Sequence, residues 1–237
     1  MVRIAICDDR NYYVERLSAM IRHWAMEKRL KLQLEAFQSG EEVLWAAEEG
    51  GSYQAVFMDI ELTGISGIEA AAGLRKLHRY MSVVFISQYD TYFRQMFEVY
   101  PCYYLEKPIP EKKLFEILDR IMEEHRYVYA MYGFRYKRRN RQIFLRKVLY
   151  FTSEMRRIRI VMEEGREYVF YMKLDTVEQQ LADYEVDFIR IHKSFLVNSR
   201  QVEQFYADHV MMSNGERLSV SRGRRENVNR FHRNLFM

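Results

Sequence analysis

The sequence predicts two folded units: an α/β unit with a doubly wound, five-stranded parallel sheet over residues 1–125, and a mainly-β unit over residues 130–237. Two observations predict the first unit. Short apolar runs alternate with segments of helical spacing, and charged or hydroxyl residues follow the apolar runs. A period-two alternation of apolar and polar residues predicts the second unit. A chain of 237 residues is long enough for each unit to bury its own core.

The first unit contains five apolar runs that are typical of buried parallel strands. They are residues 2–7, 32–37, 55–61, 83–86 and 102–106, with Asp59 placed where the third strand emerges. Helical spacing of apolar residues predicts helices in the segments between them, starting after Asp9, at Ser39 and at Ser66, then around 93–99 and over 110–124. Strands and helices therefore alternate along the whole unit, which predicts parallel pairing.

Side chains that can bind a metal ion or a phosphoryl group follow four of these strands. Asp8 and Asp9 follow the first strand, Asp59 the third, Ser87 the fourth and Lys107 the fifth. The carboxyl ends of parallel strands meet at one sheet edge, so we expect these side chains to lie together. Three crowded carboxylates repel one another and need a hard cation, which Mg²⁺ supplies. Asp59 could then act as a carboxylate nucleophile and form an acyl phosphate, with Lys107 and Ser87 bonding the phosphoryl oxygens.

The set Asp8-Asp9, Asp59, Ser87 and Lys107-Pro108 resembles the receiver domain of two-component response regulators, over about the first 123 residues. The resemblance implies a flavodoxin-like fold and a sensor histidine kinase that transfers phosphoryl to Asp59. It also implies that the backbone of Glu61 completes the Mg²⁺ shell. Ser87 and the switch aromatic Tyr104 would move after phosphorylation and reshape a face used for homodimerisation. An X-Pro bond such as Lys107-Pro108 can be cis, which would fix a tight turn here.

A second aspartyl-phosphate family provides an alternative interpretation. The run Asp59-Ile60-Glu61-Leu62-Thr63 resembles a degraded motif of the haloacid-dehalogenase-like phosphatases. That family has a second Asp where this chain has Glu61, and its other acidic residues come later, whereas Asp8 and Asp9 come first. We therefore expect no enzyme activity beyond self-phosphotransfer and hydrolysis of the acyl phosphate at Asp59.

Charge is distributed unevenly between the two halves. Residues 1–127 carry 16 Lys and Arg against 20 Asp and Glu, whereas residues 128–237 carry 21 against 13. A basic second half suggests a polyanionic partner, although a solvated basic face remains an alternative. The two cysteines, Cys7 and Cys102, are too few for a disulfide framework and are expected to be reduced. No membrane span or signal peptide is predicted, so we expect a soluble cytoplasmic protein.

The second half predicts strands joined by tight turns, with a single helix at Leu174–Leu181. The predicted strands cover residues 134–138, 142–146, 148–151, 158–161, 168–171, 188–197 and 210–218. Turns are expected at 163–165 and at Asn214-Gly215. A helix-turn-helix pattern and zinc-ligand spacing are both missing from the sequence, and Arg138-Arg139-Asn140-Arg141 is interpreted as a solvated turn.

Residues 188–198, Phe-Ile-Arg-Ile-His-Lys-Ser-Phe-Leu-Val-Asn, are the second informative stretch. As one strand, it would bury Ile189 and Ile191 and present polar side chains to phosphates. Together with residues 148–151 and 218–222, it resembles the signature of LytTR-type DNA-binding domains, over roughly residues 130–237. The resemblance implies an elongated β fold whose loops enter successive major grooves of duplex DNA.

The same resemblance assigns the DNA-binding residues. Arg157, Lys193 and Arg222 match the positions of base contacts, and arginine can bond guanine bidentately. Other residues are expected to contact the DNA backbone or to brace the strand: Arg156, Arg190, Ser194 and Asn198. His192 is interpreted as a packed ring, and Arg224 and Arg225 extend the basic edge. The predicted function is phosphorylation-controlled transcription regulation, as a dimer on paired DNA sites. The alternative is a receiver that gates RNA binding or a protein interaction.

Overall fold

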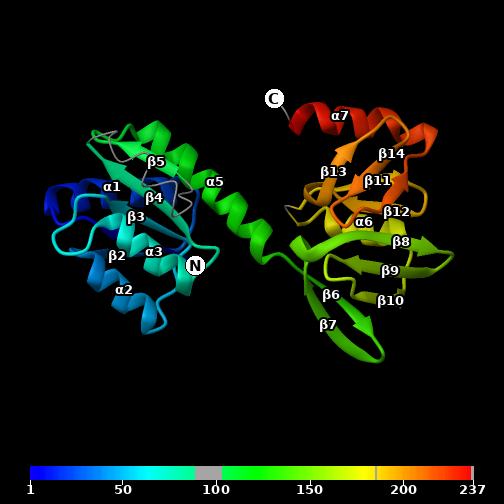
Figure 1. Cartoon of the computed structure of the whole chain (residues 1–237), viewed down its shortest axis with the longest axis horizontal. Helices are drawn as coiled ribbons and strands as arrows, with labels where there is room; N and C mark the ends of the chain where they lie inside the picture. The colour runs from blue at the N-terminus through cyan, green and yellow to red at the C-terminus, as the bar shows by residue number, and fades with distance from the viewer. Residues whose placement is uncertain (89–102, 185, 236–237) are drawn as a thin grey trace. The chain divides into compact units, whose positions relative to one another are not determined.

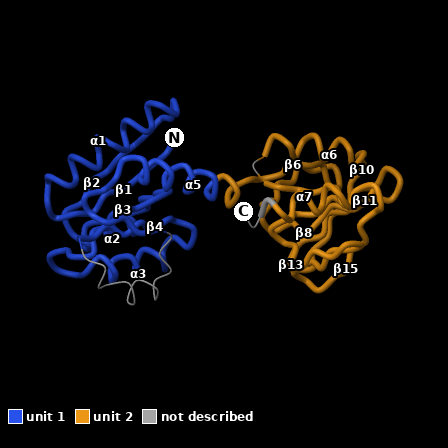
Figure 2. Tube along the Cα trace, turned by 90° about the horizontal axis from the view of Figure 1, so that it is seen from above, with its two compact units in different colours: residues 1–125 blue, residues 126–237 orange. Residues whose placement is uncertain are grey.

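A computed structural model of the chain describes residues 1–88, 103–184 and 186–235. They form two compact units, residues 1–125 and 126–237, which are coloured separately in Figure 2. The helix predicted around 93–99 lies outside the described residues, as does Cys102.

The first unit is built on a five-stranded parallel sheet (Figure 1). The strands are β1 (Val2–Cys7), β2 (Leu32–Phe37), β3 (Ala55–Asp59), β4 (Ser82–Ser87) and β5 (Tyr103–Glu106), in the order β2-β1-β3-β4-β5. Every neighbouring pair is parallel. The predicted doubly wound sheet is confirmed.

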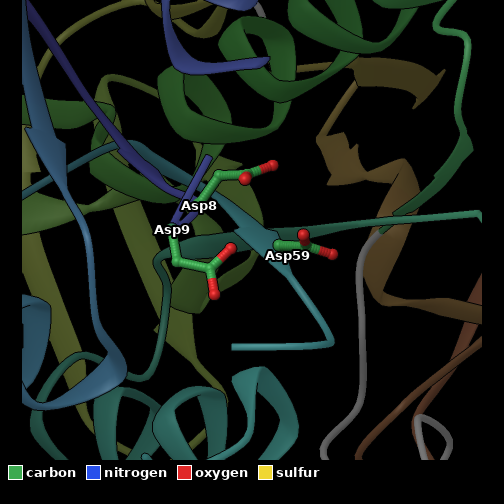
Figure 3. Close-up of side chains that lie close together, drawn as sticks. All are labelled: Asp8, Asp9 and Asp59. Carbon is green, nitrogen blue, oxygen red and sulfur yellow. The ribbon is translucent and has the colours of Figure 1, made fainter. Parts of the chain in front are cut away.

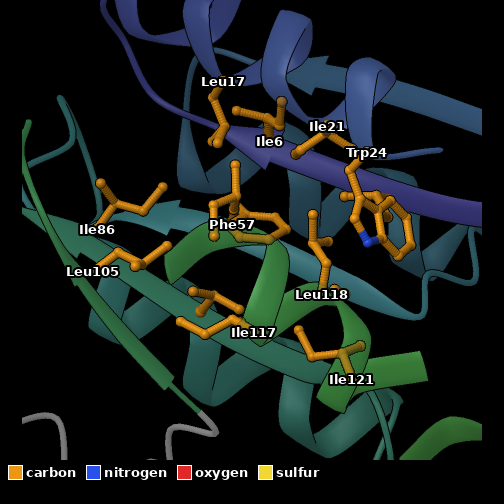
Figure 4. Packing of buried hydrophobic residues seen from close by; sticks show 14 of the residues in the cluster. Ile6, Leu17, Ile21, Trp24, Phe57, Ile86, Leu105, Ile117, Leu118 and Ile121 are labelled. Atoms are coloured by element: carbon orange, nitrogen blue, oxygen red, sulfur yellow. The ribbon is translucent and has the colours of Figure 1, made fainter. Parts of the chain in front are cut away.

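Helices cover both faces of this sheet because its strands are apolar on both sides. Helices α1 (Asn11–Glu27) and α5 (Glu111–Tyr129) pack on the face formed by Ile6, Phe57 and Ile86 (Figure 4). Helices α2 (Gly40–Glu48) and α3 (Gly67–Leu77) pack on the opposite face. Ser66 caps α3 in a capping box with Glu69, as its position before the apolar run predicts.

The second unit has a central antiparallel sheet in the order β10-β9-β8-β12-β11. Its strands are β8 (Val148–Glu154), β9 (Arg157–Met162), β10 (Glu167–Tyr171), β11 (Phe188–His192) and β12 (Phe195–Asn198). The hairpin of β6 (Met131–Tyr136) and β7 (Arg139–Phe144) and the helix α6 (Leu174–Leu181) share one apolar cluster with this sheet.

A second apolar cluster joins the central sheet to the last elements of the chain. These elements are β13 (Val202–Phe205), β14 (His209–Met212), β15 (Arg217–Ser219) and α7 (Arg225–Leu235). Short 3₁₀ turns η3 (Leu145–Lys147), η4 (Ser199–Gln201) and η5 (Arg222–Arg224) complete the unit. The predicted mainly-β architecture is confirmed.

Three predictions about the second unit were wrong. Residues 138–141 were predicted as a solvated turn, but the turn lies at Lys137 and Arg138, and residues 139–141 belong to β7. Residues 188–197 were predicted as one strand, but they form a hairpin, β11 and β12, that turns at Lys193 and Ser194. Helix α6 was predicted to be the single helix, but α7 is a second one. Helix α7 buries Val228 in the apolar cluster and packs Phe231 against it. Val228, Phe231 and Leu235 have helical spacing, so the sequence did contain a signal for this helix.

Candidate phosphorylation site and nucleic-acid interface

Three carboxylates meet at the carboxyl edge of the parallel sheet. Asp8 and Asp9 follow β1 and Asp59 ends β3, and one oxygen from each lies within 4.8 Å of the others (Figure 3). Asp8 and Asp59 are buried, with 3% and 2% exposure, and Asp9 is half-buried. Buried charges of one sign need compensation, so this acidic pocket requires a positively charged group beside its carboxylates.

Lys107 reaches the pocket from the loop after β5. Its Nζ donates to Asp8 Oδ2 at 2.6 Å and to Asp59 Oδ2 at 2.8 Å, and its side chain is buried. The Lys107-Pro108 peptide is cis, and the Lys107 N–H donates to the Ser87 carbonyl at 2.9 Å. Burial raises the pKa of the Asp8 carboxyl, and the hydrogen bond from Lys107 opposes that shift. The predicted lysine is therefore placed against the predicted acceptor.

The other predicted residues of this site occupy different depths. Ser87 ends β4 fully buried, and its neighbour Ile86 pairs with Asp59 in the sheet. Glu61 is exposed in the loop after β3. Tyr104 is half-buried on β5 against the cluster below α2 and α3. In the sheet, Ser87 pairs with Glu106, and Tyr104 pairs with Phe85.

Three contacting residues were missed from the sequence. A terminal guanidinium nitrogen of Arg10 lies 3.5 Å from Asp59 Oδ2. Thr63 Oγ1 donates to Asp9 Oδ2 at 2.9 Å. The Tyr13 ring lies under two cations, with Lys107 Nζ at 4.0 Å and the Arg10 guanidinium carbon at 4.5 Å from its centroid. Arg10 directly follows the acidic pair, which was an available signal. Tyr13 lies one turn into α1, and nothing in its spacing distinguishes it.

The loop after Asp59 is held by a close approach that requires glycine. A Cβ at Gly67 would lie 1.9 Å from the Asp59 carbonyl oxygen, and the Gly67 N–H donates to Ile60 O at 3.0 Å. Glycine is needed at such a close backbone approach because any side chain would displace the neighbouring peptide. The start of α3 therefore helps to fix Asp59.

The donor set fits a hard divalent cation. Carboxylate oxygens from three residues converge, with no imidazole beside them among the described residues, which favours Mg²⁺ over softer metals. The nearby Cys7 does not compete as a thiolate, because burial raises its pKa to about 12.

In the second unit, backbone hydrogen bonds join the segments that carry the predicted DNA contacts. The Ser153 N–H donates to Ser194 O at 3.0 Å, which joins the end of β8 to the β11–β12 turn. The Ser221 N–H donates to Ile191 O at 3.0 Å, which joins the start of η5 to β11. Arg157, Lys193 and Arg222 are all exposed on these segments. The structure therefore brings the three predicted base-contact residues onto segments that are joined by backbone hydrogen bonds.

The remaining predicted DNA residues separate into two groups. Arg156 is exposed beside Arg157, and Ser194 is half-buried in its turn. Arg190 is buried and bonds carbonyls of its own hairpin. Asn198 is fully buried, and its Nδ2 donates to Val148 O at 3.0 Å and to Leu145 O at 3.3 Å. Arg190 and Asn198 therefore occupy bracing positions.

His192 and Met155 complete the description of these turns. The His192 ring is half-buried, tilted against Phe195, and its Nδ1 accepts from the Ser194 N–H at 3.2 Å. Met155 lies at the tip of the β8–β9 turn, 97% exposed with φ of 55°. Sequence reasoning passed over Met155 because it is not a turn-forming residue.

Comparison with known families assigns both units. Residues 4–119 match the response regulator receiver domain, and residues 138–232 match the LytTr DNA-binding domain. The receiver domain of the sensor histidine kinase PA1611 from Pseudomonas aeruginosa PAO1 is a similar solved structure. It shows 20% identity and a TM-score of 0.45, and it covers 51% of this chain and 97% of its own.

Three relatives extend through both units. The sensory transduction protein LytT of Bacillus subtilis is 22% identical and covers 94% of this chain and 95% of its own length. Accessory gene regulator protein A of Staphylococcus epidermidis is 24% identical and covers 93% of this chain and 97% of its own length. The transcriptional regulatory protein BtsR of Salmonella typhi is 27% identical and covers 70% of this chain and 74% of its own length.

An acidic pocket on a parallel sheet, followed by a β unit of a DNA-binding family, defines a signalling regulator of the two-component class. More specifically, the chain belongs to the response regulators that join a receiver domain to a LytTR-type DNA-binding domain. Among the described residues, no helix has the length and apolar character that a membrane span requires.

Proposed function

We propose that a sensor histidine kinase transfers a phosphoryl group to Asp59 and that this reaction controls specific binding of duplex DNA by residues 130–237. One observation carries the first part: the ammonium group of Lys107 contacts Asp59 and Asp8 in the same buried pocket. A phosphoryl acceptor needs such a cation beside it, because negative charge accumulates there during transfer.

The proposed transfer uses groups that already face one another. A carboxylate oxygen of Asp59 forms a bond to phosphorus while the phosphorus–nitrogen bond to the kinase histidine breaks, and the imidazole keeps the electron pair. Lys107 would bond a phosphoryl oxygen, and the Ser87 hydroxyl would bond another. Asp8, Asp9, Asp59 and the Glu61 backbone would hold Mg²⁺, which offsets the negative charge of the phosphoryl group. After phosphorylation, the Ser87 hydroxyl would move towards the phosphoryl group, and the Tyr104 side chain would then move as well.

In the second unit, we assign Arg157, Lys193 and Arg222 to base contacts and Arg156 and Ser194 to phosphate contacts. The exposure of the four basic side chains, on segments joined by backbone hydrogen bonds, supports this assignment. The name of the relative BtsR, a transcriptional regulatory protein, supports control of transcription. The phosphorylated chain would bind paired sites as a homodimer, because coupling raises the effective concentration of the second unit. Such a regulator would act in the cytoplasm, where duplex DNA is accessible, without catalysing reactions on other molecules.

Mass spectrometry of the intact protein tests the acceptor. Acetyl phosphate with Mg²⁺ should add one phosphoryl mass to the wild type and none to Asp59→Asn. The matched control is Asp183→Asn, an exposed aspartate of the second unit that should label as the wild type does. Labelling of Asp59→Asn would refute the assignment.

Selection from random duplexes tests the output. Phosphorylated wild type should enrich a consensus duplex and bind it more tightly than a scrambled duplex of the same composition at physiological salt. Specific binding by such domains usually exceeds non-specific binding by at least about 1,000-fold. Equal affinity for the two duplexes would contradict sequence-specific DNA binding.

A further inference from the structure

The Arg190 guanidinium is used entirely within the protein. Its Nε donates to His192 O at 2.7 Å, and one terminal nitrogen donates to Lys193 O at 2.6 Å. The other terminal nitrogen lies 2.9 Å from Glu178 Oε2 and 3.2 Å from Asp175 Oδ1. The side chain is 7% exposed. Each of its three nitrogens therefore has a protein partner, and little of the group is accessible to a phosphate.

These bonds immobilise the backbone of the β11–β12 turn. Arg190 holds the carbonyls of His192 and Lys193, the His192 ring accepts from the Ser194 N–H, and Ser153 N–H donates to Ser194 O. Consecutive peptide groups of the turn are thus fixed from outside the turn, and the Lys193 side chain remains exposed. A fixed backbone reduces the entropy that Lys193 would lose on binding a base.

Helix α6 provides a rigid support for the clamp. Leu174, Val177 and Leu181 of α6 are buried in the apolar cluster under the sheet. Asp175 and Glu178 are three residues apart and therefore project from neighbouring positions on one helix face. Arginine suits the centre of this arrangement because its planar fork can bond two carbonyls and a carboxylate at once, which the point charge of lysine cannot.

We propose that Arg190 is a positioning residue, which with Glu178 and Asp175 locks the turn that aims Lys193 and Ser194 at DNA. The proposal rests on the proposed function, because it assumes that this turn contacts the duplex. It differs from a phosphate contact in its consequences. A phosphate-binding arginine contributes to affinity for every sequence, whereas a positioning arginine contributes to discrimination between sequences.

Two variants of Arg190 distinguish these roles. The full-length phosphorylated chain is titrated by fluorescence anisotropy against the selected consensus duplex and its scrambled counterpart at several salt concentrations. Arg190→Lys keeps the charge but loses the fork, and we expect the affinity ratio of the two duplexes to fall about 10-fold to 100-fold. Binding to the scrambled duplex should change less than about 3-fold, since the contact is internal.

Arg190→Gln and Glu178→Gln extend the test. For Arg190→Gln, the slope of log affinity against log salt should be unchanged, whereas loss of a phosphate contact would lower it by about 1. Glu178→Gln removes the support from α6 and should lower the affinity ratio by about 3-fold to 10-fold. Arg166→Lys, on the exposed β9–β10 turn, is the matched control and should bind as the wild type does. Equal losses on both duplexes, a reduced slope or an unchanged ratio would overturn the proposal.

Hydrogen exchange tests the clamp without DNA. Backbone amides of residues 192–195 should exchange at least about 10-fold faster in Arg190→Lys than in the wild type, because their local opening is no longer opposed. Amides of β1 in the first unit report whether the chain is folded and should not change. Unchanged exchange in residues 192–195 would overturn the clamp. If wild type lacks sequence preference, the proposed function fails, and this measurement still decides whether Arg190 fixes the turn.

Discussion

The acidic pocket of the first unit and the basic turns of the second unit place their charges in opposite ways. In the pocket, Asp8, Asp59 and Lys107 are themselves buried, and Lys107 donates to both carboxylates. On the turns, Lys193 and Arg222 are exposed, and the hydrogen bonds instead connect the backbones that carry them.

Because of this difference, we expect the two sites to respond differently when a charged residue is substituted. In a buried charge network, each charge is stabilised by its partners. Removal of one member therefore leaves a buried charge without a partner, which is strongly destabilising. An exposed side chain on a fixed backbone can be replaced without leaving a buried group unpaired. We therefore expect substitutions in the pocket to impair phosphorylation strongly. Substitutions on the turns should change only the discrimination between duplex sequences.

The largest expected effect is at Lys107. Lys107→Met should lower the rate of phosphorylation by acetyl phosphate about 100-fold to 1,000-fold, because a preorganised cation at the transferring group is lost. Time-resolved intact-mass measurements supply the rate. Lys112→Met, an exposed lysine at the start of α5, is the control. If Lys107→Met labelled as fast as Lys112→Met, the buried pairing would have no part in transfer.

An intermediate and selective effect is expected on the turns. Arg222→Ala and Arg157→Ala should each relax preference at defined base pairs by about 1–3 kcal/mol, since a bidentate arginine contributes that much discrimination. Their melting temperatures should stay close to the wild type because both side chains are exposed. Binding to a set of single-base variants of the consensus duplex measures the change. Unaltered discrimination at every position would remove these residues from base reading.

The smallest expected effect lies at the far side of the first unit. The Tyr53 hydroxyl donates to Glu35 at 2.7 Å, and this bond lowers the pKa of the Glu35 carboxyl. A carboxyl whose folded-state pKa is depressed stabilises the fold above its ordinary value near 4.5, and this contribution disappears as pH falls through the folded-state pKa.

Tyr53→Phe should therefore reduce the free energy of unfolding by about 1 kcal/mol at pH 7 and by less in acid. Thermal melts of Tyr53→Phe and wild type between pH 7 and pH 3 provide the comparison. A loss that stayed constant over this range would show that the packing of Tyr53, rather than its bond to Glu35, sets the effect.

The pocket could be predicted from the sequence because parallel-sheet topology fixes where strand ends meet. Once the apolar runs were recognised, Asp8, Asp59 and Lys107 had to share one edge. The contacts from Arg10 and Tyr13 could not be predicted in the same way. They depend on how a helix begins and which rotamers its first residues adopt, which a strand pattern does not contain.

The hairpin at residues 188–198 was harder to predict for a physical reason. A charged residue within an apolar run normally marks the solvent face of a strand, but Arg190 is buried because α6 supplies carboxylates to it. Lys193 is not a typical turn former and Ser194 favours turns only weakly, so the reversal carried little local signal. The local structure at such positions depends on tertiary contacts with residues that are distant in the sequence.

The short length of the β11–β12 turn has a consequence for how regulators of this kind diversify. Two residues, Lys193 and Ser194, separate the strands, while the groups that hold the turn come from Arg190, Ser153 and His192. Because the proposed base contact in this turn comes from Lys193, exchange of that side chain should change the preferred duplex and leave the scaffold intact. An engineer could vary it as a small library on an unchanged frame.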